Sequence, residues 1–147
     1  MGSEKNPPSD AREVYKSLGI ITSGRTDLVK TIRSGIRINA VYKTADAAGT
    51  SVAALGRIVG LPSTTLSRRK GTTGKLSPDE SDRLYRVASI YKDALHLFEG
   101  SKPMTQRWMN APAVALGGST PLEYLDTEAG AERVRELIWQ LESGVVI

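Results

Sequence analysis

A cluster of hydroxyl and cationic side chains is the first stretch of this sequence whose chemistry suits a ligand. The cluster consists of Ser63, Thr64, Thr65, Ser67, Arg68, Arg69 and Lys70. Hydroxyl groups form hydrogen bonds with phosphate oxygens and base edges, and cations neutralise phosphates. A surface helix with a solvated basic end is the alternative interpretation. We expect these seven residues to contact double-stranded DNA.

The residues around the cluster predict how it is presented. Apolar side chains recur there at three- and four-residue spacing, as on one face of a helix, at Val52, Leu55, Ile58 and Val59. Thr50 or Ser51 is a suitable N-cap, and Gly60 suits a turn that ends the helix. Small Gly56 allows a close helix crossing, and Leu66 provides an apolar contact from the second helix. This spacing is typical of a helix-turn-helix motif.

Further helices are expected before the motif, and they would supply its packing partners. They cover residues 11–18, residues 27–35 with Thr26 as the N-cap, and residues 36–49. The side chains expected to face inward from the last two are Leu28, Val29, Ile32, Ile38, Val41, Tyr42 and Ala45. The sequence therefore predicts an all-α fold, with residues 1–22 as a flexible leader or short helix and residues 23–75 as a DNA-binding domain.

The second half begins with the clearest helix signal in the chain. Residues 77–80 form a capping box with proline at the first helical position. An apolar face runs from Leu84 to Phe98, which makes this helix either the spine of a second domain or a dimer surface. A short helix at 103–110, a non-helical link at 111–119 and a second capping box at 120–123 follow. Thr127 should cap the last helix, whose inward side chains are Val134, Leu137, Ile138 and Leu141.

The balance of charged residues also changes between the two halves of the chain, at about residue 75. Residues 12–75 carry twelve Lys and Arg against three Asp and Glu, whereas residues 76–147 carry seven against eleven. A basic half suits a polyanion, and an acidic half would be repelled by one. We therefore expect residues 76–147 to form a helical domain that has a different partner.

The sequence gives little support for a catalytic site or a metal site. The chain has no cysteine and one histidine, His96, which we interpret as a boundary residue beside the apolar face. A Walker loop is excluded because Arg69 and Leu76 occupy its glycine and hydroxyl positions around Gly74-Lys75. Gly117-Gly118 could cradle an anion, but a tight turn explains it more simply. No apolar run is long enough to cross a bilayer, so we expect a cytoplasmic protein without enzyme activity or cofactor.

The C-terminal third resembles the toxin-binding domain of the Xre/MbcA/ParS antitoxin family. The residues that carry this likeness are Arg107-Trp108-Met109-Asn110, Pro112, Ala115-Leu116-Gly117-Gly118, Thr120-Pro121-Leu122, Leu125, Thr127, Gly130, Val134, Leu137 and Glu142-Ser143-Gly144. Residues 66–70, 76–78 and 81–85 look like the same family's join between the helix-turn-helix and that domain. The likeness covers about residues 24–147.

This resemblance implies an antitoxin of a type II toxin–antitoxin pair. Its toxin would be a RES-domain enzyme that destroys NAD⁺, and its helix-turn-helix would repress the shared operon, with the protein acting as a homodimer or a toxin–antitoxin hetero-oligomer. The alternative is a transcriptional regulator whose C-terminal domain dimerises or senses a ligand.

The inhibitory contact is expected at the C-terminus. An NAD⁺ site must hold pyrophosphate, so it should offer cations to an anion such as the terminal carboxylate. We therefore assign toxin binding to Glu132, Glu136, Trp139, Glu142, Gly144, Val145, Val146 and Ile147. In the alternative, the apolar tail folds back onto its own domain.

Overall fold

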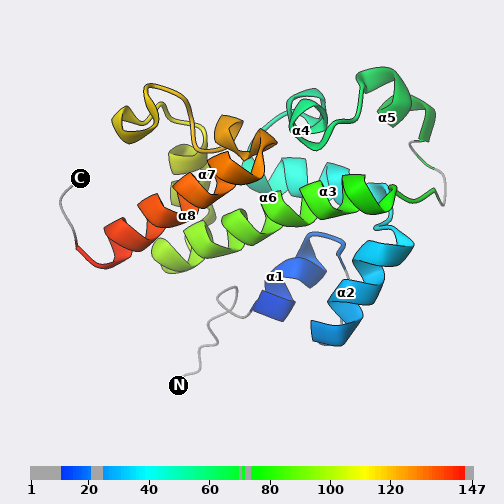
Figure 1. The fold of residues 1–147 in the computed structure, drawn as a ribbon, viewed down its shortest axis with the longest axis horizontal. Coiled ribbons are helices and arrows are strands. Elements are labelled where there is room, and N and C mark those ends of the chain that lie inside the picture. Colours follow the sequence, from blue (N-terminus) through cyan, green and yellow to red (C-terminus); the bar gives the residue numbers. More distant parts are fainter. Residues whose placement is uncertain (1–10, 21–24, 70, 72–73, 145–147) are drawn as a thin grey trace.

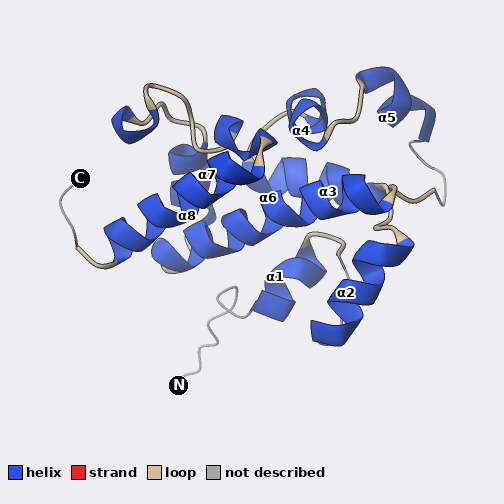
Figure 2. Cartoon of the chain, in the orientation of Figure 1, coloured by secondary structure: helices blue, strands red, loops and turns tan. Residues whose placement is uncertain are grey.

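The structure, a computed structural model, describes residues 11–20, 25–69, 71 and 74–144. Within these ranges the regular elements are helices, which are joined by loops and turns. In chain order the elements are α1 (Ala11–Ser17), α2 (Arg25–Ser34), α3 (Asn39–Ala48), α4 (Val52–Val59), α5 (Ser63–Arg69), α6 (Pro78–Leu97), α7 (Lys102–Met109), the 3₁₀ turns η2 (Val114–Leu116) and η3 (Glu123–Asp126), and α8 (Glu128–Glu142). The described ranges contain no strand (Figure 2). The predicted all-α fold is confirmed.

Helix α6 forms where its capping box predicts. The Ser77 hydroxyl accepts a hydrogen bond from Glu80 N–H at 3.1 Å, and the Glu80 carboxylate accepts one from Ser77 N–H at 2.8 Å. Pro78 occupies the first helical position, where no amide hydrogen is needed. The helix ends before Glu99 and Gly100, which both have positive φ.

Helix α6 lies at the centre of the molecule, with other helices on several sides of it. In Figure 1, α8 runs beside it, α1 and α2 lie below it, and α5 occupies one end of the molecule. The buried residues of its apolar face include Leu84, Val87, Ala88, Tyr91 and Leu95. Because the chain's own helices cover this face, it is not free to serve as a dimer contact. Of the two interpretations of this face, the structure supports the internal spine.

Helix α1 confirms the short amphipathic helix expected before Gly19, and it is part of the core. Val14, Tyr15, Leu18 and Ile20 are all buried. The ring of Tyr15 packs on that of Tyr85 in α6, with centroids 5.5 Å apart. Burial raises the pKa of the Tyr15 phenol well above its ordinary value, so the group stays neutral. Residues 1–10 of the predicted leader lie outside the described residues.

Three details of the sequence prediction are wrong. Val29 is 48% exposed and Leu141 is 39% exposed, although both were expected to face inward. Helix α2 packs through Leu28 and Ile32 instead, and α8 packs through residues up to Ile138. The link at 111–119 contains the 3₁₀ turn η2 and is not free of helix. The predicted cap at Thr26 lies outside the described side chains.

Candidate functional site

The α4–α5 pair has the geometry of a helix-turn-helix. Ser51 caps α4 by accepting a hydrogen bond from Ala54 N–H at 3.0 Å. Gly60 makes the turn with a backbone φ of 83°, a value that residues other than glycine rarely adopt. A Cβ atom at Gly56 would lie 2.7 Å from the Leu61 carbonyl oxygen and 2.8 Å from a Leu66 methyl group. The small residue, the turn glycine and the buried leucine therefore act as their spacing predicted.

Most of the seven predicted DNA-contacting residues lie on α5. Ser63, Thr64, Ser67 and Arg68 are exposed, and Thr65 and Arg69 are partly buried. Lys70 lies outside the described residues. Apart from Lys70, the cluster thus presents one hydroxyl-rich helix that carries a solvent-facing guanidinium group. This arrangement can bind phosphates and base edges.

Arg69 differs from Arg68 because its guanidinium lies 3.4 Å from the carboxylate of Glu80. The same carboxylate oxygen accepts the capping hydrogen bond of α6. Arg69 therefore connects the end of α5 to the start of α6. Sequence reasoning missed this role, although the acidic capping box eleven residues away was a usable signal.

Two more side chains hold the motif from outside it. The Tyr42 hydroxyl donates to the Leu66 carbonyl at 3.3 Å, and Arg83 donates to the Val59 carbonyl at 3.1 Å. Val59 is the last residue of α4, where carbonyl groups lack helical partners. Helices α3 and α6 therefore fix the orientation of α4 and α5. The sequence offered no local signal for either contact.

The second candidate surface is the exposed side of α8. Thr127 caps this helix as predicted, accepting from Gly130 N–H at 3.0 Å. Glu132, Glu136 and Glu142 are exposed, and Trp139 is 62% exposed. An indole this open is unusual, since large aromatic side chains are mostly buried. Gly144 follows with φ of 72°, and residues 145–147 of the predicted tail lie outside the described residues.

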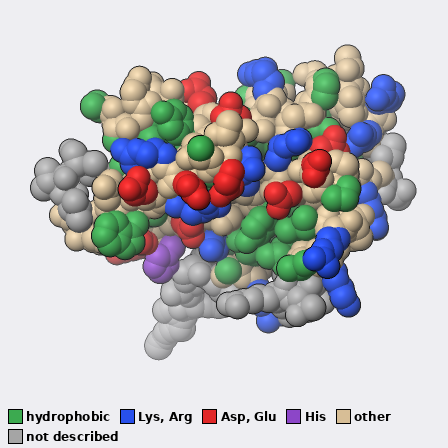
Figure 3. Space-filling view, viewed as in Figure 1, with side chains coloured by type: hydrophobic (Ala, Val, Ile, Leu, Met, Phe, Trp, Pro, Cys, Tyr) green, Lys and Arg blue, Asp and Glu red, His purple; other side chains and the backbone are tan. Residues whose placement is uncertain are grey.

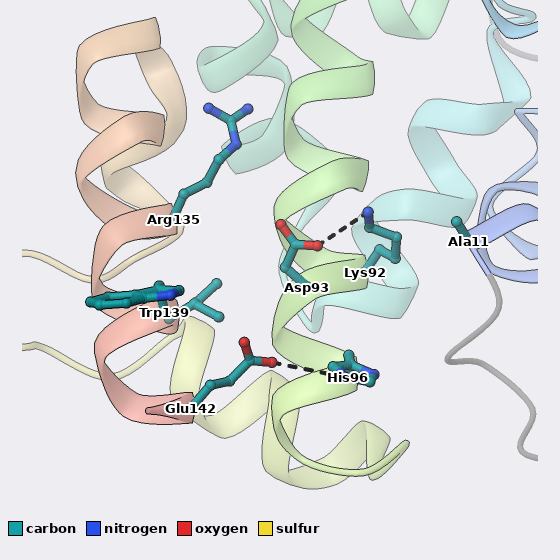
Figure 4. Close-up of a pocket in the computed structure, with 8 residues that line it drawn as sticks. Ala11, Lys92, Asp93, His96, Arg135, Trp139 and Glu142 are labelled. Carbon is teal, nitrogen blue, oxygen red and sulfur yellow. Dashed lines mark ion pairs between the residues drawn. The ribbon is translucent and has the colours of Figure 1, made fainter. Parts of the chain in front are cut away.

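A pocket of about 340 Å³ lies along the contact between α6 and α8, beside Trp139 (Figure 4). Its charged residues come from both helices and include Lys92, Asp93, Arg135 and Glu142. His96 faces Glu142 across it, with Nε2 4.0 Å from the carboxylate. His96 lies off the apolar face, as expected, but it is a solvent-exposed residue with a side chain 65% exposed.

Glu128, at the start of α8, pairs with arginine side chains from both α6 and α8. Its carboxylate accepts hydrogen bonds from Arg135 and Arg86, each at 3.1 Å. The bond from Arg135, with the positive charge of both guanidinium groups, lowers the pKa of Glu128. The group remains ionised at neutral pH and holds α8 against α6.

The described part of the chain gives little support for a metal site, for an anion site at Gly117-Gly118 or for a membrane-spanning helix. No group of three or more His, Asp or Glu side chains is arranged to hold a metal ion there. Gly117 and Gly118 both have positive φ, and the Gly118 N–H donates to the Ala113 carbonyl at 2.9 Å. They form a tight turn, and a Cβ atom at either would meet nothing within 4 Å. No described helix combines the length and apolarity that crossing a membrane requires.

Comparison with known proteins shows the family to which this chain belongs. Residues 27–89 match the Antitoxin Xre-like helix-turn-helix domain, and residues 93–144 match the Antitoxin Xre/MbcA/ParS C-terminal toxin-binding domain. The chain belongs to the Xre/MbcA/ParS antitoxin family. The first match includes α4 and α5 and reaches into α6, and the second includes α7 and α8.

Individual relatives agree over nearly the whole antitoxin chain. An Antitoxin Xre from Yersinia enterocolitica is 34% identical over 139 residues, which cover 95% of this chain and 94% of the relative. An Antitoxin Xre from Photorhabdus laumondii is 32% identical over 90% of both chains. A Prs ADP-ribosylating antitoxin from a Sphingobium strain is 21% identical over 94% of this chain and 88% of its own. The recognition of the family from the C-terminal residues is confirmed.

Proposed function

We propose that this antitoxin neutralises a RES-domain toxin that degrades NAD⁺, and that it represses its own operon through α5. The observation that carries the proposal is the separation of two unlike surfaces on one chain. Helix α5, with its exposed hydroxyl groups, lies at one end of the molecule, and α8, which carries the exposed Trp139, extends toward the other end (Figure 1). One protein can then hold an operator and a toxin at the same time.

Operator binding is supported by the exposed side chains of α5. Ser63, Thr64, Ser67 and Arg68 project from a helix that α4 and Leu66 hold in place. One such helix reads only a few base pairs, so two-fold related copies on a palindrome supply the remaining affinity. The antitoxin therefore acts as a dimer or within a toxin–antitoxin hetero-oligomer. Since the apolar face of α6 is internal, the dimer contact is made by another surface.

Toxin binding is supported by the anionic and aromatic groups on α8. Trp139 offers a large, partly solvated anchor of the kind that dominates protein interfaces. Glu132, Glu136 and Glu142 suit the rim of a cationic site, and we propose that the segment from Gly144 onward enters that site. ADP-ribosyl transfer consumes NAD⁺, so the name of the Sphingobium relative fits an NAD⁺-using partner. This inhibition takes place in the cytoplasm, where NAD⁺ and the operon are found.

Co-expression with the product of the adjacent gene tests the proposal. We expect the two proteins to co-purify and the antitoxin to prevent the loss of cellular NAD⁺. An antitoxin that lacks residues 144–147 should still bind its operator but no longer protect NAD⁺. Full protection by the truncated form would show that the domain surface blocks the toxin and that the tail does not. A neighbour that leaves NAD⁺ untouched would refute the RES-toxin assignment.

A further inference from the structure

A short antiparallel bridge joins the segment after α2 to the segment before α6, and it pairs Arg37 with Lys75. Its two flanking hydrogen bonds run from Ile38 N–H to the Gly74 carbonyl at 3.0 Å and from Leu76 N–H to the Ile36 carbonyl at 2.8 Å. Bonds in these positions define a non-hydrogen-bonded pair, in which the Cα atoms are about 4.5 Å apart and the side chains are closest. Arg37 and Lys75 therefore lie directly opposite each other.

The bridge is firmly anchored beneath these two residues. The flanking Ile36, Ile38 and Leu76 are at most 3% exposed. Ile36 N–H donates to the hydroxyl of Ser81 in α6 at 2.8 Å, in a fully buried hydrogen bond. Because side chains alternate along an extended segment, buried neighbours direct Arg37 and Lys75 outward, and both are exposed.

The charges of this pair are not compensated within the described part of the protein. Neither Arg37 nor Lys75 forms an ion pair with a described residue. Like charges directly opposite each other on paired strands destabilise the fold. An anion between the two side chains would remove this repulsion, and a backbone phosphate is an anion of suitable size and charge.

The position of the bridge indicates which phosphate this would be. Lys75 follows Arg69, the last residue of α5, by six residues, and Arg37 follows the end of α2 by three. In Figure 1 these segments meet at the end of the molecule that carries α5. Figure 3 shows Lys and Arg side chains along the same margin. The bridge therefore lies at the same end of the molecule as α5, whose exposed face we assign to the operator.

We propose that Arg37 and Lys75 form a second DNA-binding element, which clamps the operator backbone beside the bases that α5 reads. The proposal rests on operator binding by α5. The pair contributes affinity and salt dependence but no base preference, since phosphate contacts carry no sequence information. The bridge fixes the backbone of both residues before DNA arrives, so no ordering of these two segments is left for the binding step.

The test compares the double variant R37Q/K75Q with K102Q/R107Q, which removes the same charge from exposed positions on α7. The probe is a DNA duplex that carries the promoter region of the antitoxin's own operon. Each lost phosphate contact lowers the log–log salt slope by about 0.9. R37Q/K75Q should therefore make the affinity loss between about 50 and 200 mM salt roughly tenfold smaller, with base preference unchanged. K102Q/R107Q should leave the salt slope as in the parent protein.

A second measurement on the free protein separates binding from folding. With the repulsion removed, R37Q/K75Q should melt at the same or a higher temperature than the parent in low salt. A lower melting temperature, an unchanged salt slope, or an equal change in K102Q/R107Q would overturn the proposal. If the parent binds the duplex, and R68A lowers the affinity for the duplex while R37Q/K75Q leaves it unchanged, only the proposal of the Arg37–Lys75 clamp is rejected. If the parent does not bind, operator binding itself fails.

Discussion

Arg68 and Arg69 are adjacent and carry the same charge, but their surroundings give them different tasks. Arg68 is exposed on α5, and Arg69 lies 3.4 Å from the Glu80 carboxylate, with its side chain 33% exposed. A partly buried ion pair is costly to break, because the partner is left without compensation. At the residue scale, Arg68 is therefore the better candidate for direct DNA contact, and Arg69 positions α5.

Replacing Arg68 by alanine should weaken operator binding without unfolding the antitoxin. If the guanidinium meets a phosphate, the salt slope should fall by about 0.9 for all sequences. If it reads a guanine edge, the loss should be about 1–3 kcal/mol and confined to one base position. R107A, on exposed α7, controls for loss of charge. Titrations of parent and variant at several salt concentrations distinguish these outcomes, and unchanged binding in R68A would exclude this residue from the contact.

At the element scale, the sequence predicted what local hydrogen bonds decide. The caps at Ser51, Ser77 and Thr127 depend on residues three positions apart, so their pattern is visible in the chain. The turn at Gly60 is equally local. The Arg37–Lys75 bridge and the Arg83 contact to Val59 join residues that are 38 and 24 positions apart. Periodicity carries no information on such pairs, because tertiary packing determines them. The same reason explains why Val29 faces solvent.

Two glycines of the helical elements allow each surface to be disturbed separately. In G56A the new methyl group would meet the Leu61 carbonyl and Leu66, whereas in G130A it would meet the Tyr124 carbonyl of η3. Overpacking of this kind costs about 1–3 kcal/mol, which exceeds the roughly 1 kcal/mol gain in helix propensity. G56A should reduce operator affinity more than toxin affinity, and G130A should do the reverse. Binding assays with both partners measure this, and equal losses in both variants would contradict separate surfaces.

At the scale of the whole molecule, the two family domains share one core. Helix α6 buries side chains against α1 to α4 and also against α7 and α8. The side-chain amides of Gln106 in α7 and of Asn110, its C-cap, donate to the carbonyls of Ala47 and Ala48 at the end of α3, each at 2.9 Å. Those carbonyls lack helical partners, so α7 completes α3. The DNA-binding and toxin-binding parts therefore depend on each other for stability.

This shared core should make unfolding a single cooperative transition. Both tryptophans, Trp108 and Trp139, lie in the toxin-binding half, so their fluorescence reports that half alone, while far-ultraviolet circular dichroism reports all helices. We expect both signals to give the same melting temperature. G56A, in the DNA-binding half, should then lower the tryptophan transition by about 2–4 °C per kcal/mol of destabilisation, as much as the dichroism transition. Independent domains would behave differently, because G56A would leave the tryptophan transition where it is and split the dichroism curve in two. A single surface substitution such as A53S, at an exposed position of α4, should move neither transition.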